Sequence, residues 1–363
     1  MDKIKRLICA HVPVSTCNLR CKYCYITVHK RGDTELPEFN HTPKEIGRAL
    51  SKERLGGICF VNLCAGGETL LPPVMVDIIK CILEQGHYVE VVTNGTVSKR
   101  FNEIIKLPSN LLERLTFKFS FHYLELKRIN MLDIFFENIR KIKNVGCSFT
   151  VEMTPNDELE SHIDDIKDLS IKEFGALCHL TIARNDRKKE MPLLSNHSLR
   201  EYAKIWSQFH SAMFDFKKTL FQVKRREFCY AGDWTAYINL GTGKITKCYC
   251  SEEIGNIFDL SKPVKFEAIG KCPLAYCYNG HAHLAFGVIP SLITPTYAEI
   301  RNQKCVDTTE WIKPKMGKFM MGKLKENNAE YSNVKKIQLS LRSNLKLLFS
   351  TPKKIVRKLF SHL

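Results

Sequence analysis

Residues 7–24, LICAHVPVSTCNLRCKYC, combine an apolar run with a loop that carries three cysteines. The run from Leu7 to Val14 has the length and residue types of a buried strand, and Cys17, Cys21 and Cys24 follow it closely. In parallel α/β folds the functional side chains lie just after the carboxyl ends of the strands. We therefore expect a parallel sheet whose first strand leads into a site.

The rest of the first half of the chain repeats this order of strand and helix. Helical patterns cover Pro43 to Leu55, Pro72 to Gln85 and Leu132 to Lys143, and a longer helix is expected from His197 to Phe216. This alternation is typical of βαβ units and predicts an α/β fold. The further strands are expected near Ile58 to Cys64, Tyr88 to Thr93, Leu115 to Phe121, Cys147 to Met153 and Leu177 to Ala183.

The cysteine loop is suited to an iron–sulfur cluster. Three thiolates within eight residues can ligate three irons of a [4Fe-4S] cluster and leave the fourth iron open. Zinc binding or burial of the thiols is the alternative interpretation, because short cysteine spacings also occur in zinc proteins.

Composition narrows the class of protein. The chain has 363 residues and 15 cysteines, an odd number that leaves at least one thiol outside any disulfide framework and favours metal or cluster ligation. No apolar run is long enough to cross a bilayer, so we expect a cytoplasmic protein. Of the net charge of +17, the segment from Lys313 to Leu363 carries +11, which argues against a nucleic-acid-binding body.

Three motifs in the first half resemble one family. The pattern CxxxCxφC, with Tyr23 as the aromatic residue, resembles the signature of the radical S-adenosylmethionine (SAM) superfamily. Gly66-Gly67-Glu68 resembles the GGE motif of that family, Thr93-Asn94-Gly95 resembles its TNG turn, and Ser120 resembles a polar cosubstrate contact. Thr69 stands where the family usually has proline.

The resemblance implies a partial (β/α)6 TIM-like barrel over residues 1–220 and an enzyme that cleaves SAM reductively to a 5′-deoxyadenosyl radical. A low-potential electron donor such as flavodoxin or ferredoxin is implied with it. Cys17, Cys21 and Cys24 would ligate the cluster, and Glu68 would bind the amino group of the cosubstrate. The remaining cosubstrate contacts would come from Tyr23, Gly66, Gly67, Asn94 and Ser120. His122 is a candidate substrate contact, and Glu152 is either an exposed strand-end charge or a pocket group.

A second group of cysteines follows the predicted barrel. A hairpin turning at Gly241-Thr-Gly243 would bring Cys229 near Cys248, and Cys272 and Cys277 could complete the ligands of an auxiliary [4Fe-4S] cluster. The segment resembles the SPASM and Twitch auxiliary domains, with Gly255-Asn256-Ile257 in place of their GN(I/L), and implies a small α+β Twitch-like domain over residues 221–312. A structural zinc is the alternative, and Cys250, Cys305 and His281 are further candidate ligands.

Substrate and partners are less constrained by the sequence. The resemblance implies oxidative modification of a peptide or of a sugar or glycan intermediate. A basic tail over residues 313–363 has patterns that could form amphipathic helices and contact anionic lipid. The alternative function is a non-catalytic zinc-binding or electron-transfer protein, a role that does not require Gly66-Gly67-Glu68.

Overall fold

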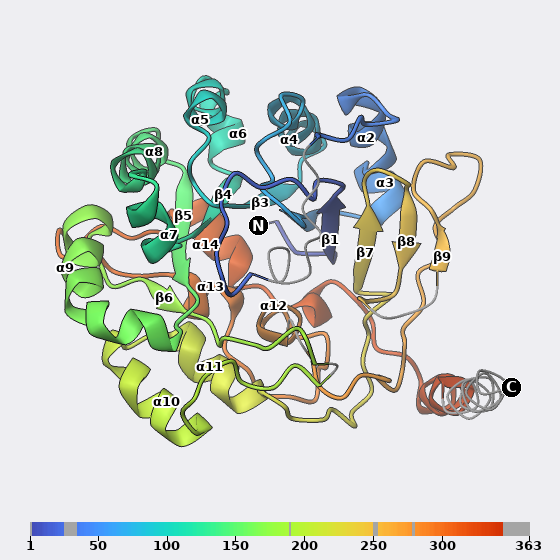
Figure 1. Ribbon diagram of the computed structural model, residues 1–363. Coiled ribbons are helices and arrows are strands. Elements are labelled where there is room, and N and C mark those ends of the chain that lie inside the picture. The colour runs from blue at the N-terminus through green and yellow to red at the C-terminus, as the bar shows by residue number, and fades with distance from the viewer. Residues whose placement is uncertain (1, 25–34, 189, 250–252, 278–279, 344–363) are drawn as a thin grey trace, which may run out of the picture.

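The computed structural model describes residues 2–24, 35–188, 190–249, 253–277 and 280–343 (Figure 1). Its centre is a nine-stranded sheet in the order β6-β5-β4-β3-β2-β1-β7-β8-β9, in which the first six strands of the chain are parallel. This arrangement confirms the predicted α/β class and partial barrel. The six strands are β1 (Arg6–Val12), β2 (Cys59–Ala65), β3 (Tyr88–Thr93), β4 (Leu115–Ser120), β5 (Ser148–Met153) and β6 (His179–Leu180).

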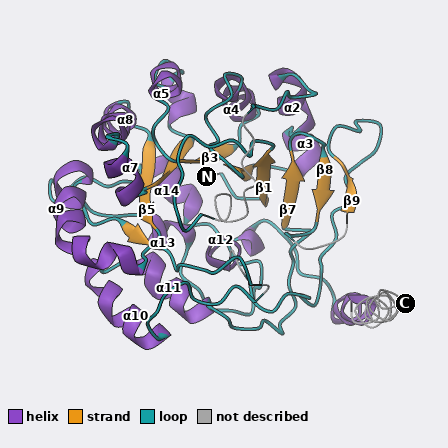
Figure 2. Ribbon diagram, in the orientation of Figure 1, coloured by secondary structure: helices purple, strands orange, loops and turns teal. Residues whose placement is uncertain are grey.

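Helices cover the outer face of these strands (Figure 2). The first of them begins at a capping box, in which the Thr42 side chain accepts from the Glu45 backbone and the Glu45 side chain accepts from the Thr42 backbone. The outer helices are α2 (Pro43–Ala49), α3 (Lys52–Leu55), α4 (Met75–Glu84), α5 (Ser98–Ile104), α6 (Ser109–Leu112), α7 (Tyr123–Arg128), α8 (Leu132–Asn144) and α9 (Ile163–Phe174), the last preceded by a 3₁₀ helix over Asp157–His162.

The single helix predicted from His197 to Phe216 is wrong. The segment forms α10 (Leu199–Trp206), a 3₁₀ turn (Ser207–Phe209) and α11 (Ala212–Leu220). His210 has a left-handed backbone with φ 47°, and the Ser211 side chain then caps the next helix by accepting from the Phe214 N–H. The break follows from these two local conformations.

The sheet continues beyond the predicted barrel. β7 (Thr235–Asn239) pairs in parallel with β1, from Leu7 opposite Thr235 to His11 opposite Asn239. It then forms the predicted hairpin with β8 (Lys244–Thr246), and β9 (Glu253–Asn256) lies at the edge. The segment assigned by sequence to an auxiliary domain therefore shares the sheet of the barrel.

C-terminal helices fill the inner side of the barrel at the amino ends of the strands. These are α12 (Gly280–Ala285), α13 (Tyr297–Arg301), α14 (Pro314–Met320) and a 3₁₀ turn (Leu324–Glu326). Phe60 packs 5.5 Å from Tyr297 between ring centres, and Tyr88 stacks on Phe319 at 3.7 Å. The first residues of the predicted basic tail are thus part of the core, because α14 is amphipathic; residues 344–363 of that tail lie outside the described residues.

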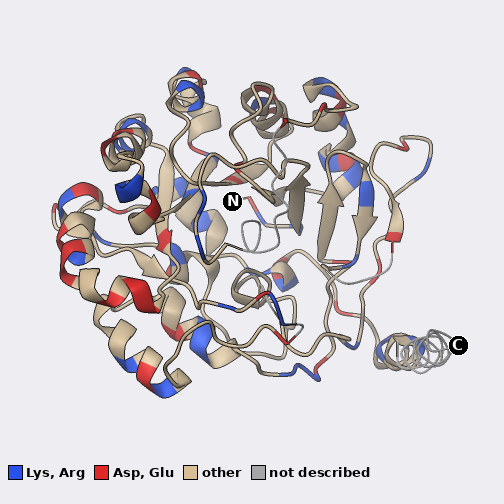
Figure 3. Cartoon of the chain, viewed as in Figure 1, with Lys and Arg blue, Asp and Glu red and all other residues tan. Residues whose placement is uncertain are grey.

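None of the described helices is both long and apolar enough to cross a membrane. Lys and Arg alternate with Asp and Glu along the outer helices, so the charge on these helices is mixed (Figure 3).

Candidate functional site

The cysteine loop lies at the carboxyl end of β1, as predicted. Cys21 is buried, and Cys17 and Cys24 are half-buried. The loop is held by its own backbone, since the Cys24 N–H donates to Cys21 O at 3.1 Å and the Leu19 N–H points to the Cys17 sulfur at 3.5 Å. The three thiols therefore lie on one short, internally bonded turn.

The glycine motif after β2 packs directly against the backbone that leads into this loop. The Gly67 N–H donates to Val14 O at 2.7 Å, and the Glu68 N–H donates to Thr16 O at 3.0 Å. A Cβ atom added to Gly67 would lie 1.9 Å from Thr16 O. Glycine is needed at position 67 because two segments of backbone approach closely, a reason that the resemblance alone did not give.

Glu68 joins the glycine motif to the turn after β3. Its carboxylate is buried and accepts from the Thr93 hydroxyl at 2.6 Å, the Asn94 N–H at 2.7 Å and the Leu70 N–H at 3.0 Å. Burial raises the pKa of this carboxyl group, and the three hydrogen bonds oppose that rise. Binding of the cosubstrate's amino group by Glu68 stays a prediction. In the structure, the Glu68 carboxylate holds the glycine motif against the turn after β3.

Asn94 connects the turn after β3 to the cysteine loop. Its amide Nδ2 lies 2.8 Å from Asn18 Oδ1 and 3.8 Å from the Cys17 sulfur, and its Oδ1 accepts from both the N–H and the hydroxyl of Thr96. A hydrogen-bond donor beside a cysteine sulfur is one of the features that tune an iron–sulfur cluster. The three sequence motifs are thus brought together by direct contacts.

Ser120 and Tyr23 occupy different parts of the same edge. Ser120 ends β4, half-buried and opposite Glu152 in the sheet register. The Tyr23 hydroxyl lies 2.5 Å from His122 Nδ1, and burial lowers the pKa of His122 to about 4, so two neutral groups share a hydrogen bond whose direction depends on the imidazole tautomer. A cavity of about 360 Å³ adjoins this pair and includes Cys21 in its wall.

The spacing of the sulfur atoms tests whether the loop fits a cluster. Within the described residues, one group of three His, Cys, Asp or Glu ligand atoms lies within 4.8 Å of one another, and it contains no cysteine. Four sulfurs around one zinc ion would lie roughly 4 Å apart. Cys17, Cys21 and Cys24 do not form such a close group, whereas a cluster would bind each thiolate to a different iron.

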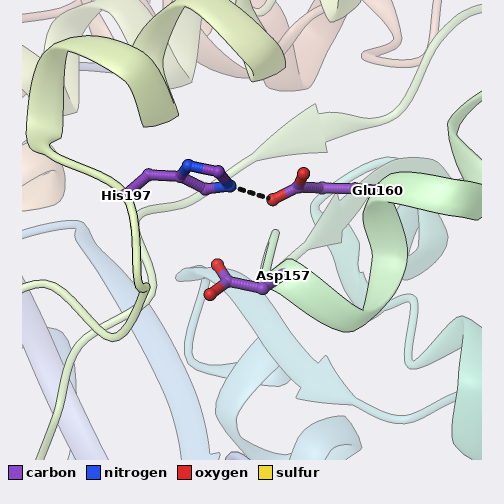
Figure 4. A group of neighbouring side chains, drawn as sticks. All are labelled: Asp157, Glu160 and His197. Carbon is purple, nitrogen blue, oxygen red and sulfur yellow. Dashed lines mark hydrogen bonds and ion pairs between the residues drawn. The ribbon is translucent and has the colours of Figure 1, made fainter.

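That one close group is Asp157, Glu160 and His197, and its contacts explain it without a metal (Figure 4). His197 Nε2 is 2.8 Å from Glu160 Oε1, and the Asp157 carboxylate accepts from the Ser195 hydroxyl and the Asn196 N–H. These bonds attach the segment before α10 to the 3₁₀ helix before α9.

The chemistry of the thiols agrees with ligation. Burial raises the pKa of Cys21, and the neighbouring Cys24, Glu125 and Cys17 raise it further. Without a nearby cation such thiols stay protonated, and bound metal supplies the positive charge that stabilises thiolates. Three thiols on one turn at the carboxyl end of β1 are the donor set that a cubane cluster with one open iron requires.

The second set of predicted ligands also gathers in space. The Cys229 backbone forms an isolated antiparallel β-bridge with Gly270 beside the hairpin. Burial raises the pKa of its thiol most, and the nearby Cys277 and Cys272 thiols raise it further. The pKa of Cys248 is likewise raised by burial and then by Cys277, Cys229 and Cys272. The four thiols are thus close enough to interact electrostatically.

The additional candidate ligands lie elsewhere. Cys250 is outside the described residues. The Cys305 thiol is buried beside α9, where it donates to Phe174 O at 3.5 Å. His281 is buried in α12 and lines the inside of the barrel.

A cavity of about 390 Å³ lies inside the barrel, below the edge that carries the motifs. Alternate residues of the strands face it, as the two-residue period of a strand requires. Its walls include His11, Cys64, Glu90, Lys118, Tyr237 and Arg301. A pocket of about 30 Å³ adjoins it, shares Arg184 and His281 with it, and reaches Cys277 and Lys217.

Charged side chains that the sequence analysis did not single out line this cavity, among them Glu90, Lys118 and Arg301. Glu152, left open in the sequence analysis, is a buried group paired with Lys118 at 3.2 Å and with Arg301 at 2.8 Å. Lys118 stands between Phe117 and Phe119 in β4, and Glu90 stands inside the apolar run of β3. A charged residue within a buried strand was the signal available for these two; Arg301 offered none.

Comparisons with known proteins agree with this geometry. Residues 12–170 match the model of the radical SAM superfamily. A segment of 89 residues is 29% identical to 7-carboxy-7-deazaguanine synthase of Thermoplasma acidophilum, covering 24% of this chain and 38% of that relative's length.

Two solved structures match this chain at lower sequence identity. SuiB of Streptococcus suis bound to S-adenosylmethionine is 16% identical, with 70% of this chain and 64% of that chain covered and a TM-score of 0.49. Native anSMEcpe with bound AdoMet and Cp18Cys peptide is 13% identical, with 96% and 99% covered and a TM-score of 0.47.

The family match begins at the last residue of β1 and includes the cysteine loop, the glycine motif and the turn after β3. Residues 12–170 therefore match a radical SAM superfamily domain, and this match implies a [4Fe-4S] cluster and S-adenosylmethionine as cofactors.

Proposed function

We propose that this chain is a radical SAM enzyme that binds its [4Fe-4S] cluster through Cys17, Cys21 and Cys24. One observation supports this most strongly: Gly67, Glu68 and Asn94, from two separate turns, contact the backbone or a sulfur of the cysteine loop. When bound, the cluster and SAM supply a 5′-deoxyadenosyl radical by reductive cleavage. A zinc-binding or electron-transfer role needs no such constellation.

The chain's own residues position the reactants. Glu68 holds the glycine motif and the turn after β3 in register, and Asn94 fixes the turn against Cys17. With Tyr23, Gly66 and Ser120 at the same edge of the sheet, they are the proposed cosubstrate contacts.

The barrel cavity is the proposed substrate site. Its volume of about 390 Å³ is within the ordinary range for small-molecule pockets. The site is enclosed by the sheet on one side and by α12 and α13 on the other, which would keep water from a reactive radical.

We further propose an auxiliary [4Fe-4S] cluster on Cys229, Cys248, Cys272 and Cys277, in a Twitch-like segment over residues 221–312. A cluster there would supply an electron acceptor or a ligand for the substrate. Support comes from the small pocket that contains Cys277 and shares Arg184 and His281 with the barrel cavity. An auxiliary cluster beside the substrate site would suit an oxidative reaction on a peptide, or on a sugar or glycan intermediate. Flavodoxin or ferredoxin is the proposed electron donor for SAM cleavage.

The test is anaerobic reconstitution, followed by iron and sulfide analysis, EPR spectroscopy and an assay for 5′-deoxyadenosine with dithionite and SAM. About eight irons per chain are expected, and a variant with Cys17, Cys21 and Cys24 changed to Ala should retain about four and lose cleavage. Cys81→Ala, on outer helix α4, is the control and should keep both. Zinc in place of iron, or cleavage by the triple variant, would overturn the proposal.

A further inference from the structure

The inner face of the barrel carries one charged or amide side chain in each of four consecutive strands, namely Asn62, Glu90, Lys118 and Glu152. They lie at inward positions in the sheet, with Asn62 paired to Glu90 in the register of β2 and β3. Lys118 and Glu152 continue the series on β4 and β5. Buried strands seldom hold such residues without a function or a compensating partner.

Cations outnumber carboxylates around the cavity. Lys118, Arg184 and Arg301 line it, and Lys217 lines the adjoining pocket. Burial lowers the pKa of His281 most, and the charges of all four cations lower it further, so all four lie close to this side chain. Burial lowers the pKa of Lys217 to about 7, so a bound anion would favour its charged form. The carboxylates nearby are Glu90, which lines the cavity, and Glu152, which pairs with Lys118 and Arg301.

The two carboxylates are already engaged. Glu90 accepts from the Tyr297 hydroxyl at 2.9 Å and from the Asn62 amide. Glu152 is shared between Lys118 and Arg301. Glu152 is therefore divided between two cations, while the negative charge of Glu90 acts on Arg301 through space.

Buried donors also remain without partners. Arg301 is fully buried, and its Nε and Nη2 have no hydrogen-bond acceptor among the described residues. His281 Nδ1, on a side chain 7% exposed, has no partner among them either, and in this neutral ring it is a donor in the tautomer that carries the proton there. Unsatisfied charged donors facing a cavity are costly, and a bound anion would satisfy them.

We infer that the substrate carries an oxyanion, a carboxylate or a phosphate, which Lys118, Lys217 and Arg301 bind inside the barrel. The inference rests on the proposed function, because it takes the cavity as the substrate site. Lys118 precedes Ser120 by two residues, so the anion site lies about 7 Å below the strand ends where the cosubstrate would bind. The part of the substrate facing that edge is then the part that reacts.

The opposite wall suits the body of such a substrate. On β1 and β7, three and four strands from β4 around the sheet, His11 stacks on Tyr237 at 6.0 Å between ring centres, and Tyr237 lies 5.2 Å from Tyr249. Aromatic faces of this kind pack against the apolar face of a ring. The cavity therefore offers cations on one side and aromatic rings on the other.

The test is anaerobic isothermal titration of the reconstituted, SAM-saturated full chain with three probes that share one ring: glucose, glucuronate and glucose 6-phosphate. Because SAM itself carries a carboxylate, saturating the protein with SAM fills the site for that group, so the probes cannot bind there. Either anion should bind saturably while glucose does not, and the tighter of the two identifies a carboxylate or a phosphate substrate. Equal binding of glucose, or binding of neither anion, would overturn the inference.

Lysine variants test whether the anion binds at the proposed site inside the barrel. Lys217→Met and Lys118→Met each remove one cation and leave Glu152 with Arg301, so both should raise the Kd of the anion about tenfold or more. Lys218→Met is the control: the neighbouring cation on α11 pairs with Asp215 at the surface and should change the Kd less than twofold. If the Kd of the anion were unchanged in both Lys217→Met and Lys118→Met, the assignment of these residues to the anion site would be refuted.

A second readout separates this inference from the proposed function. Formation of 5′-deoxyadenosine without substrate is measured in the wild type and in the control Lys218→Met, where it should be equal, and the circular dichroism spectrum of Lys217→Met should match that of the wild type. Absence of cleavage in the wild type would count against the proposed function alone, whereas loss of anion selectivity with cleavage intact would count against the anion site alone.

Discussion

Replacement of Gly67 by alanine should separate the glycine motif from the cysteine loop. The added Cβ would lie 1.9 Å from Thr16 O, against an ordinary contact of at least 3.4 Å, so the two segments must part by about 1.5 Å. The hydrogen bonds from Gly67 N to Val14 O (2.7 Å) and from Glu68 N to Thr16 O (3.0 Å) join these segments and would break. Two lost bonds at about 1 kcal/mol each and strain of about 1–3 kcal/mol give about 3–5 kcal/mol of lost stability.

The assay is urea unfolding of the anaerobically purified chain, followed by tryptophan fluorescence, together with iron content after reconstitution. The matched control is Gly317→Ala in α14, where the added Cβ meets Ile312 at 3.6 Å without a clash and should stabilise the helix by about 0.5–1 kcal/mol. If Gly67→Ala lost less than about 1 kcal/mol and kept its full iron content, the close-approach argument would be refuted.

Three other predictions concern charge and hydrogen bonding. Glu152→Gln should lower the free energy of unfolding by about 3–5 kcal/mol in urea titrations, because it leaves buried cations without a carboxylate; Glu158→Gln, from an exposed pair, should change it by less than about 1 kcal/mol. His87 is buried, its Nδ1 accepts from the Cys59 N–H, and burial lowers its pKa to about 4. Its contribution is therefore complete above pH 6.5 and lost as the pH falls towards 4, by about 3 kcal/mol, and a His87→Gln variant should show a flatter pH dependence in the same titrations. Asn94→Ala removes the amide beside the Cys17 sulfur and should make the cluster's midpoint potential more negative in an EPR-monitored titration; an unchanged potential would contradict that contact.

The sequence predicted those parts of the fold that depend on local pattern. The six parallel strands could be predicted because each is a short apolar run followed by a helical segment. The break at His210 could not, because the segment contains neither glycine nor proline there and the left-handed turn depends on packing around Ser211. The place of β7 beside β1 was not legible either, since strand order in a sheet is set by tertiary contacts.

The candidate site divides in the same way. The cysteines, Glu68 and Asn94 were found because motifs mark them in the sequence. Glu68 and Asn94 also proved to hold the loops together, which requires the hydrogen bonds of the folded chain. Arg301 reaches Glu152 across about 150 residues of sequence, and no local pattern connects the two.

The parallel pairing of β7 with β1 bears on how the chain folds. Leu7 is opposite Thr235, so the strand that leads into the cysteine loop keeps one open edge until more than two hundred further residues have been made. An open edge of a buried apolar strand readily pairs with other chains. A fragment ending at residue 220 would keep that edge exposed and should aggregate, whereas a fragment extended through β9 should not. The order of synthesis thus delays completion of the barrel until the second set of cysteines is being added.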